Sequence, residues 1–485
     1  EIVNSDWSSD VCSSDLWLYT TLNILYVFTT VSIIIVIIME NRNPVKSLAW
    51  VVVLVCFPFV GIIFYLFFGQ NYRKKRMISR KGRQELKKTD EMITTDIHSL
   101  PISDTAKQTV YCAQTLDNAP YYSGNQVRIF TNGKEKFDVL LQDLKAAQSY
   151  VHLQYYIIEN DNIGRRIKRA LLDCAHRGVQ VRILYDDVGC RSIKKQFFKD
   201  MEAAGIEIHP FLKVSFSRVA SRINYRNHRK ICVIDGEIGY IGGMNIADRY
   251  IDGVSWGIWR DTHLRVAGPA AHGLEYSFAV DWSFERKELL SDTYYFPRTG
   301  TPGTTGMQIV TSGPIGKWYN LSMLFLKAIS SAKRYVYLQT PYFLPTDSLM
   351  KVIQAAALSR VDIRIMLPER SDSKILMLAS NSYVAQLLSA GAKVYFYKPG
   401  MLHSKAIVID DEIATVGSTN FDFRSFEHNF EANALIYDPA VAIEMKEIFL
   451  NDQSKCRRVT SHEWRKRSRH RKIQESLMRL LSPVL

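Results

Sequence analysis

Two stretches of the sequence decide the fold: HRKICVIDGEIGYIGGMN at residues 228–245 and HSKAIVIDDEIATVGSTN at residues 403–420. They align without a gap. Three further pairs of segments repeat in the same order, among them SYVHLQYYIIEND at 149–161 and RYVYLQTPYFLPTD at 334–347. A repeat with so long a period is not a solenoid. It predicts two homologous α/β lobes that face each other across a pseudo-two-fold axis.

Each repeated stretch is typical of a buried strand followed by a turn and a second short strand. The runs ICVID and AIVID are apolar on both faces, as central strands covered by helices should be. His228 and Lys230 are two residues apart, so their side chains point to the same face of a strand, and the same holds for His403 and Lys405. Each lobe therefore delivers one imidazole and one ammonium group side by side.

Asp235 and Asp410 end the two motifs, seven residues after each histidine. At this odd spacing they face away from the histidine on a regular strand. We therefore expect these two aspartates of the motif to hold the following turn rather than to carry protons.

Small and polar residues follow each motif at the same offsets. Gly243 and Asn245 follow the first motif, and Ser418 and Asn420 follow the second. Small residues let a ligand approach the backbone closely. Together with the two lysines, these residues are predicted to surround a phosphate and to stabilise the charge that develops on its oxygens.

Two imidazoles suit phosphodiester exchange without a metal. One attacks phosphorus as a nucleophile, and the other protonates the leaving alkoxide and then deprotonates the incoming hydroxyl. Each imidazole needs an orienting partner. Asp261, in WRDTHLR, and Glu431, in NFEANALIY, begin the next predicted strand of each lobe, and we assign them as the carboxylates behind the two histidines.

The remaining histidines and the cysteines show no pattern of a metal site. We interpret His152, His209 and His263 as ordinary strand residues. The seven cysteines are scattered and include no Cys-x-x-Cys pair, which argues against a disulfide framework and a cysteine zinc site. We therefore expect no metal and no cofactor, and a folded part that faces a reducing compartment.

Two long apolar runs precede the lobes. Residues 17–39 and 48–68 contain no charge and would span about 34 and 31 Å as helices, enough to cross a bilayer. The eight-residue link ENRNPVKS makes the pair a predicted transmembrane hairpin. Seven basic residues lie between Arg73 and Arg83, so we expect the lobes to be cytoplasmic and the protein to be multi-pass.

The chain is therefore expected to divide into six segments. Residues 1–16, EIVNSDWSSDVCSSDL, resemble nothing that follows, and we interpret them as a non-native leader. The C-terminal RRVTSHEWRKRSRHRK, followed by LMRLL, is either a solvated helix face or a second contact with the membrane surface. The expected segments are the leader (1–16), the hairpin (17–69), a basic polar connector (70–120), the two lobes (121–295 and 296–450) and a basic, helical tail (451–485).

The paired His-x-Lys-x4-Asp-x6-Gly-[Gly/Ser]-x-Asn motifs resemble the phospholipase D superfamily over residues 120–450. ENRNPVKSLAW, FFGQNYRKK, WRDTHLR and the terminal ESLMRLLSPVL resemble bacterial cardiolipin synthases within that superfamily, over residues 17–485. The resemblance implies an α/β fold in which two lobes, each a mixed sheet flanked by helices, share one active site. It also implies an enzyme of the bacterial inner membrane that condenses two phosphatidylglycerol molecules to cardiolipin and releases glycerol. The implied intermediate is a phosphatidyl-histidine. By analogy with the family His228 is the nucleophile and His403 the acid and base, but the sequence is nearly symmetric at the two motifs and leaves open which histidine is the nucleophile.

Other functions are weighed against this one. The same intermediate could be attacked by water, as in a hydrolase, or by another acceptor alcohol, and the motifs leave that choice and the oligomeric state open. The net charge of +14 favours an anionic partner such as a membrane surface and also permits nucleic acid. Two predicted membrane spans argue against a nuclease, and two intact motifs argue against a catalytically silent scaffold.

Overall fold

The computed structural model describes residues 7–39, 44–57, 60–65, 77, 79–90, 96–213 and 225–482. The described residues divide into two units, the N-terminal helices up to Tyr65 and the rest of the chain from Met77 onward. The two units are described separately below.

The N-terminal unit contains α1 (Trp7–Met39), α2 (Pro44–Cys56) and α3 (Val60–Phe64). Within α1, Leu16–Met39 is long and apolar enough to cross a membrane, with a mean hydropathy of 2.5. The Tyr26 hydroxyl donates a hydrogen bond of 3.0 Å to the Leu54 carbonyl oxygen, so α1 and α2 contact each other. The helix α1 begins inside the segment that we set aside as a leader.

The second predicted span is described only in part. Its described residues form α2 and α3, each shorter than a bilayer span, and residues 58–59 lie outside the described residues. Between these helices the sequence contains Pro58, a residue type that cannot donate the backbone hydrogen bond of a helix interior. Residues 66–70 and the basic residues 73–76, on which the predicted orientation depends, lie outside the described residues. The described chain thus has one helix long enough to span a membrane and an adjoining apolar segment.

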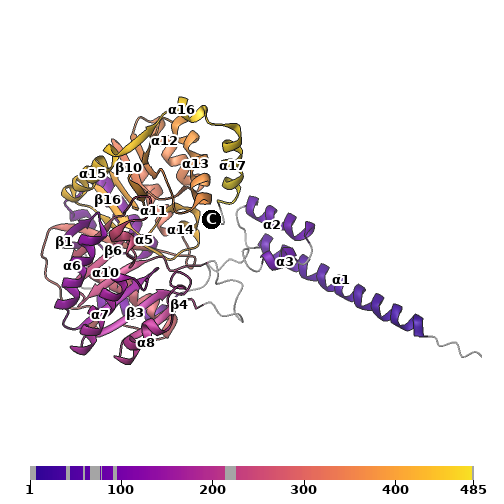
Figure 1. The fold of residues 1–485 in the computed structure, drawn as a ribbon, viewed down its shortest axis with the longest axis horizontal. Coiled ribbons are helices and arrows are strands. Elements are labelled where there is room, and N and C mark those ends of the chain that lie inside the picture. Colours follow the sequence, from indigo (N-terminus) through magenta and orange to yellow (C-terminus); the bar gives the residue numbers. More distant parts are fainter. Residues whose placement is uncertain are drawn as a thin grey trace, which may run out of the picture. The chain divides into compact units, whose positions relative to one another are not determined.

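The second unit is built on one mixed sheet of fifteen strands (Figure 1). The strands of the first lobe are β1 (Tyr122–Phe130), β2 (Tyr150–Tyr155), β3 (Gln180–Asp186), β4 (Glu207–Phe211), β5 (Lys230–Ile234), β6 (Ile238–Gly242) and β8 (His263–Ala267). Those of the second lobe are β9 (Thr305–Ser312), β10 (Tyr335–Gln339), β12 (Asp362–Pro368), β13 (Lys393–Tyr397), β15 (Ala406–Ile409), β16 (Ile413–Gly417), β18 (Glu431–Ile436) and β19 (Cys456–Val459).

The strand order confirms the predicted two-lobed α/β fold. From the centre outward, the first lobe runs β1-β8-β6-β5-β2-β3-β4 and the second runs β9-β18-β16-β15-β10-β12-β13, with β19 added at the edge. The lobes join where β1 pairs antiparallel with β9, with Tyr122 opposite Met307 and Asn125 opposite Thr305. The Asn125 amide donates to the carbonyl oxygens of Tyr122 and Thr305 at this junction. An antiparallel junction between equivalent strands relates the lobes by an approximate two-fold axis.

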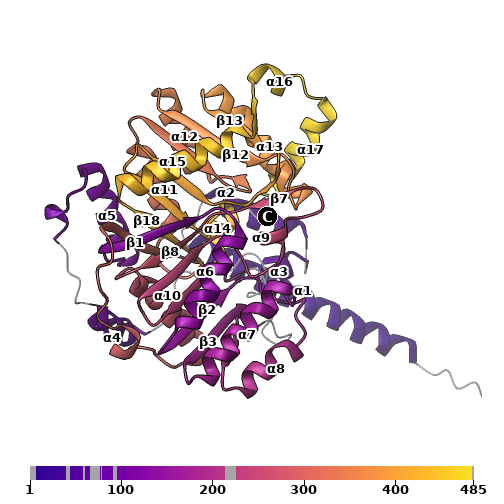
Figure 2. The same ribbon diagram turned by 60° about the vertical axis from the view of Figure 1, so that its left-hand side comes forward.

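Helices cover both faces of the sheet, as Figure 2 shows. Alternation along β5 places Ile231 and Val233 in one apolar core and Cys232 and Ile234 in the other. The core that contains Ile231 packs against α10 (Ala271–Arg286) and α15 (Pro439–Ser454). The core that contains Cys232 packs against α6 (Gly133–Ala146), α7 (Asn162–His176), α8 (Gln196–Ala203), α11 (Asn320–Ser330), α12 (Asp347–Leu358) and α13 (Lys374–Ser389).

Helices also precede and follow the lobes. They are α4 (Arg80–Asp90), the 3-10 helix η3 (Ile97–Ser99), α5 (Asp104–Asp117), α16 (Ser461–Arg465) and α17 (Arg469–Leu480). One face of α5 is buried in the core through Ala106, Val110 and Ala113. The Asp117 carboxylate at the end of α5 accepts a hydrogen bond of 2.8 Å from the Thr311 hydroxyl. The segment that we read as a connector therefore contributes to the core of the second lobe.

Candidate active site

The aspartates of the two motifs hold the ends of neighbouring strands. Asp235 has a positive φ of 54°, a conformation that Asp tolerates better than most residues. Its carboxylate accepts hydrogen bonds from the backbone N–H groups of Gln148, Ser149 and Tyr150 at 2.8–2.9 Å. These contacts fix the turn after β5 to the start of β2.

Asp410 does the same in the second lobe. Its φ is 56°, and its carboxylate accepts from the backbone N–H groups of Lys333, Arg334 and Tyr335 at 2.6–2.9 Å. Both aspartates thus occupy turns at the far end of the strand from the histidine, where a structural role is expected.

The carboxylate behind His228 comes from the opposite lobe. Nδ1 of His228 lies 3.0 and 3.1 Å from the two carboxylate oxygens of Glu431 and 3.0 Å from the Ser418 carbonyl oxygen. A carboxylate and a carbonyl can only accept hydrogen bonds, so Nδ1 carries the proton. The Glu431 side chain is fully buried and also accepts from the Ser418 hydroxyl.

His403 shows the reciprocal arrangement. Its Nδ1 lies 2.6 Å from a carboxylate oxygen of Asp261, which belongs to the first lobe and is fully buried. Among the described residues, neither His228 nor His403 forms a hydrogen bond through Nε2. Each ring is therefore held by its Nδ1 side and keeps its second nitrogen for a ligand.

Backbone contacts between the lobes create this exchange. The short strand β14 (Gly400–Leu402), which precedes His403, pairs in parallel with β7 (Ile258–Arg260), which precedes Asp261. Asn227 and Phe430 form the equivalent bridge before the other histidine and its carboxylate. As a result, the strand that leads to each histidine lies beside the segment that leads to the carboxylate of the other lobe.

The two lysines lie behind the imidazoles. Lys230 and Lys405 are 1% and 3% exposed, and each ammonium group donates to the carbonyl oxygen of the histidine two residues earlier. Nζ of Lys405 also lies 2.8 Å from Nδ1 of His403. Because that Nδ1 shares its proton with Asp261, the ammonium group acts on the ring through its charge.

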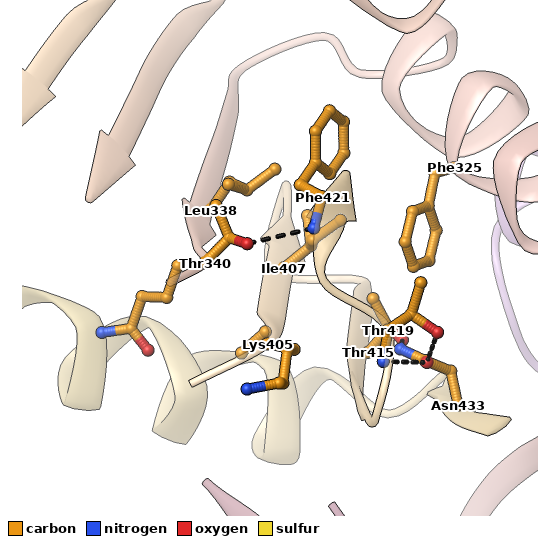
Figure 3. Close-up of a pocket in the computed structure, with 11 residues that line it drawn as sticks. Phe325, Leu338, Thr340, Lys405, Ile407, Thr415, Thr419, Phe421 and Asn433 are labelled. Atoms are coloured by element: carbon orange, nitrogen blue, oxygen red, sulfur yellow. Dashed lines mark hydrogen bonds between the residues drawn. The ribbon is translucent and has the colours of Figure 1, made fainter. Parts of the chain in front are cut away.

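A small internal pocket borders Lys405 (Figure 3). Its volume of about 10 Å³ is too small for a lipid headgroup. In Figure 3 the ammonium group of Lys405 points away from Phe325 and Phe421, while Asn433 accepts a hydrogen bond of 2.6 Å from the Thr419 hydroxyl. This pocket therefore belongs to the packing beneath the motif.

A cavity with a volume of about 480 Å³ lies where the two lobes meet. Both histidines open onto it, and so do Asn245 and Asn420. The other residues that line it are Tyr156, Ile157, Arg226, Arg249, Tyr250, Trp259, Tyr342, Asp372, Ser373, Ile375, Leu376, Asp422, Arg424 and Asn429.

Gly243 and Ser418, which we expected beside a phosphate, do not line this cavity. A Cβ atom on Gly243 would lie 2.1 Å from a carboxylate oxygen of Asp261, so this position needs glycine for the close approach of the carboxylate. Ser418 is 1% exposed and contacts Glu431. Both residues support the carboxylates instead, because the tails of the motifs pass behind the histidines.

Burial and charge set the protonation of the site. Burial lowers the pKa of His228 to about 4, so its imidazole is neutral near pH 7. Burial and the adjacent Lys405 also lower the pKa of His403. Burial by itself would raise the pKa of Asp261, but Lys405 and His403 hold it below its ordinary value.

The ammonium groups respond to burial in the same way. Burial lowers the pKa of Lys405 to about 8 and the pKa of Lys230 well below its ordinary value. Burial would raise the pKa of Glu431, yet His228 and Lys230 keep it below its ordinary value. The centre is thus a compact array of two carboxylates, two imidazoles and two amines whose charges depend on one another.

Comparisons with known proteins decide the family. Residues 140–255 and 325–453 match the family described as "Cardiolipin synthase, PLD-like domain", and residues 24–70 match "Phospholipase_D-nuclease N-terminal". The chain is 40% identical over 477 residues to the major cardiolipin synthase of Bacillus subtilis, covering 96% of this chain and 98% of the relative. It is also 40% identical to cardiolipin synthase 2 of Staphylococcus epidermidis, with 96% of each chain covered.

The chain belongs to the cardiolipin synthases of the phospholipase D superfamily. It is accordingly a phosphatidyltransferase with phospholipid substrates, and its family and its apolar N-terminal helix indicate association with a membrane. A solved phosphatidylserine synthase of Haemophilus influenzae matches its fold with a TM-score of 0.60, covering 78% of this chain and 100% of the other at 13% identity.

Three arginines of this cardiolipin synthase lie in the cavity wall and were missed by the sequence analysis. They are Arg226, Arg249 and Arg424. Two of them could have been found, because Arg249 follows Asn245 by four residues and Arg424 follows Asn420 by the same distance. The repeat therefore extends to Asn-x3-Arg. Arg226 has no such counterpart, since the equivalent position of the second copy is Met401.

Nothing in the described part of this cardiolipin synthase gathers three or more His, Cys, Asp or Glu side chains into an arrangement that could hold a metal ion. The six described cysteines are unpaired.

Proposed function

We propose that this cardiolipin synthase transfers the phosphatidyl group of one phosphatidylglycerol to a second one, through a phosphatidyl-histidine on His228. The observation that carries the proposal is the exchange of carboxylates between the lobes. It gives one cavity two imidazoles, each fixed through Nδ1 by Glu431 or Asp261 and each with Nε2 left for the substrate. Double displacement at phosphorus requires such a pair of groups.

In the first step, the neutral Nε2 of His228 attacks the phosphorus of the donor lipid. A bond from nitrogen to phosphorus forms and the bond from phosphorus to the glycerol oxygen breaks. His403 gives its Nε2 proton to the departing oxygen, so glycerol leaves as a neutral alcohol. The Asp261 carboxylate, 2.6 Å from Nδ1, stabilises the imidazolium form of His403 that this step requires.

In the second step, the acceptor is a glycerol hydroxyl of another phosphatidylglycerol. His403 removes its proton, the oxygen attacks phosphorus, and the bond from phosphorus to His228 breaks. The product is cardiolipin, and both histidines return to their starting protonation. Both steps take place at the same phosphorus atom, so the histidines of both lobes have to face one cavity.

The cavity wall supports two anionic substrates. The guanidinium groups of Arg226, Arg249 and Arg424 suit phosphate, because their paired N–H donors match its oxygens. Asn245 and Asn420 add neutral amides near the histidines. We assign the phosphate contacts to these residues rather than to Gly243 and Ser418, and the charge of the buried lysines acts from behind the rings.

Product analysis tests the proposal. The full chain is reconstituted in vesicles with phosphatidylglycerol as the only phospholipid, and cardiolipin and glycerol should appear in equal amounts. His228→Ala is the control that should form neither. Phosphatidic acid without cardiolipin would identify a hydrolase, and a product formed only when another alcohol is added would identify a headgroup transferase.

We also propose that the catalytic lobes face the cytoplasm of a bacterial cell and that the apolar segments cross the inner membrane as a hairpin. The seven basic residues between Arg73 and Arg83 support this orientation. Protease treatment of right-side-out and inverted membrane vesicles tests it. Cleavage of the lobes in right-side-out vesicles alone would contradict the orientation.

A further inference from the structure

The helix α17 carries an exposed apolar stripe. Ile473, Leu477, Leu480 and Leu481 are 58, 53, 76 and 42% exposed, and their spacing of four, three and one residues places them along one side of the helix. A contiguous apolar stripe on the surface of a folded unit commonly marks a contact with a partner or a membrane.

The opposite side of α17 is fixed to α13. The Arg479 guanidinium lies 4.2 Å from the centre of the Tyr383 ring, and the Tyr383 hydroxyl lies 3.3 Å from the Ser482 hydroxyl. Figures 1 and 2 both show the two helices side by side. The apolar stripe is therefore held outward by specific contacts and is not the surface of a loose tail.

The charge around the stripe is positive. Glu475 is the only acidic residue of α17; it is 1% exposed and accepts hydrogen bonds from Arg467 at 2.6 Å and Arg471 at 3.4 Å. The exposed residues just before and at the start of the helix include Arg465, Lys466 and Arg469. An apolar side with basic neighbours is the pattern of a helix that lies in the interface of an anionic membrane.

The same helix that anchors α17 also forms part of the cavity wall. Ser373, the N-cap of α13, lines the active-site cavity together with Ile375 and Leu376. Ile375 is 47% exposed, so an apolar side chain also lies at the mouth of the cavity. A surface that contacts α17 and the first turn of α13 would lie directly where a lipid headgroup has to enter.

We propose that α17 and the first turn of α13 form a platform that lies on the anionic bilayer and presents the cavity to its lipids. The apolar stripe inserts between the acyl chains near the headgroups, and the basic residues contact the phosphates. The N-terminal helix only tethers the enzyme, whereas the platform orients the cavity. The proposal rests on the proposed function only in assuming that the substrate enters from a bilayer.

Photocrosslinking tests the position of the stripe independently of catalysis. A benzophenone amino acid is placed at Leu477 or, as a matched control, at Leu450 of α15, which covers the opposite face of the sheet and is 38% exposed. The full chain is reconstituted in vesicles of radiolabelled phosphatidylglycerol and phosphatidylethanolamine. Lipid should be crosslinked at Leu477 about tenfold more than at Leu450, and less in vesicles of phosphatidylcholine alone.

Two outcomes would overturn the platform. One is crosslinking of lipid at Leu477 that is no stronger than at Leu450. The other is crosslinking of Leu477 to a second copy of the chain, which would identify the stripe as a subunit interface. Neither outcome depends on which product the enzyme makes, so failure of the platform can be told apart from failure of the proposed reaction.

Kinetics add a second arm. The double variant Ile473→Gln/Leu477→Gln should lose about tenfold in rate on phosphatidylglycerol in vesicles, because two apolar side chains no longer insert. On phosphatidylglycerol dispersed in detergent micelles it should keep the wild-type rate. The control Ile443→Gln/Leu450→Gln, on α15, should be unchanged in both. An equal loss in vesicles and in micelles would contradict an orienting role.

Discussion

The two lobes share their strand order and their motif but differ in the side chains that are buried beneath the motif. In the first lobe the amine of Lys136 is fully buried, donates a hydrogen bond of 3.0 Å to the Tyr155 hydroxyl and lies 3.9 Å from the centre of the Phe137 ring. His263 is fully buried nearby, and its ring nitrogens have no hydrogen-bond partner among the described residues. A cluster of this kind is unfavourable unless the surrounding fold is stable enough to hold it.

The second lobe has ordinary packing in the same places. Alignment of the repeat puts Leu321 opposite Lys136, Thr340 opposite Tyr155, and Asn433 opposite His263. The duplicated scaffold has therefore kept the strands and the catalytic motif while the interior has diverged. Two copies of one motif consequently have different surroundings, which is a physical basis for giving the two histidines different tasks.

The largest expected effect comes from removing either histidine. His228→Ala and His403→Ala should each lose at least roughly 10²–10⁴-fold in the rate of cardiolipin formation, the range typical of acid–base groups. Trapping the covalent intermediate with radiolabelled phosphatidylglycerol distinguishes the roles of the two histidines. His403→Ala should still form a labelled protein slowly, and His228→Ala should form none. A labelled His228→Ala protein would mean that His403 is the nucleophile and that His228 is the acid and base.

Neutral amides in place of the exchanged carboxylates should have the next largest effect. Glu431→Gln and Asp261→Asn keep the shape but allow the wrong imidazole tautomer, which can cost up to about 10⁴-fold in rate. The structure predicts that Glu431→Gln impairs His228 and therefore labelling, although the two residues belong to different lobes. Normal labelling by Glu431→Gln together with failed labelling by Asp261→Asn would mean that each carboxylate serves its own lobe.

The pH profile separates the two lysines. Lys405 should lose its proton as the pH rises through about 8, so the rate should fall above that value by up to about tenfold per pH unit. Lys405→Arg stays charged and should lack this fall, even if its absolute rate is lower. Lys230→Arg should retain it, because the Lys405 ammonium group that titrates near pH 8 is still present. If the rate of Lys405→Arg still falls above this pH, the loss of a proton from another group causes the fall.

The smallest effect on activity is expected at Lys136. Burial lowers the pKa of Lys136 from its ordinary value to about 7, so between pH 7 and that ordinary value the unfolded chain binds more protons than the folded one. The free energy of unfolding should therefore rise with pH above 7, by up to about 1.4 kcal/mol per unit. Lys136→Leu should remove this dependence and be more stable at pH 7.

Thermal unfolding in detergent at several pH values measures this effect. The reciprocal variant Leu321→Lys, at the aligned position of the second lobe, should destabilise that lobe. It should also introduce the same rise of the free energy of unfolding with pH. A Lys136→Leu variant that keeps the pH dependence of the wild type would show that the slope has another source.

Much of this architecture could be predicted because the repeat is so nearly complete. The runs from His228 and His403 fix two copies of the same strands, and the odd spacing of Asp235 and Asp410 correctly indicates that they lie away from the histidines. The family follows from the same residues. Local pattern was sufficient for these features since strand alternation depends only on neighbouring positions.

The exchange between lobes could not be predicted from the pattern. Glu431 and Asp261 follow their own motifs closely in the chain, yet each contacts the histidine of the other lobe, 203 and 142 residues away in sequence. Spacing carries no information about how two lobes dock. The second membrane span stays a prediction: its described residues form α2 and α3, and Pro58 lies between these helices in the sequence.

The reciprocal contacts between histidine and carboxylate also make each lobe dependent on the other. A single lobe standing alone would hold an imidazole with no carboxylate beside it and a carboxylate with no imidazole. Only a two-fold dimer of such lobes would complete both pairs. A one-lobe protein with this arrangement would therefore need a second copy to complete its site, whereas in this chain the covalent link between the lobes supplies the partner. Because the two lobes are separate stretches of one sequence, each can also differ from the other.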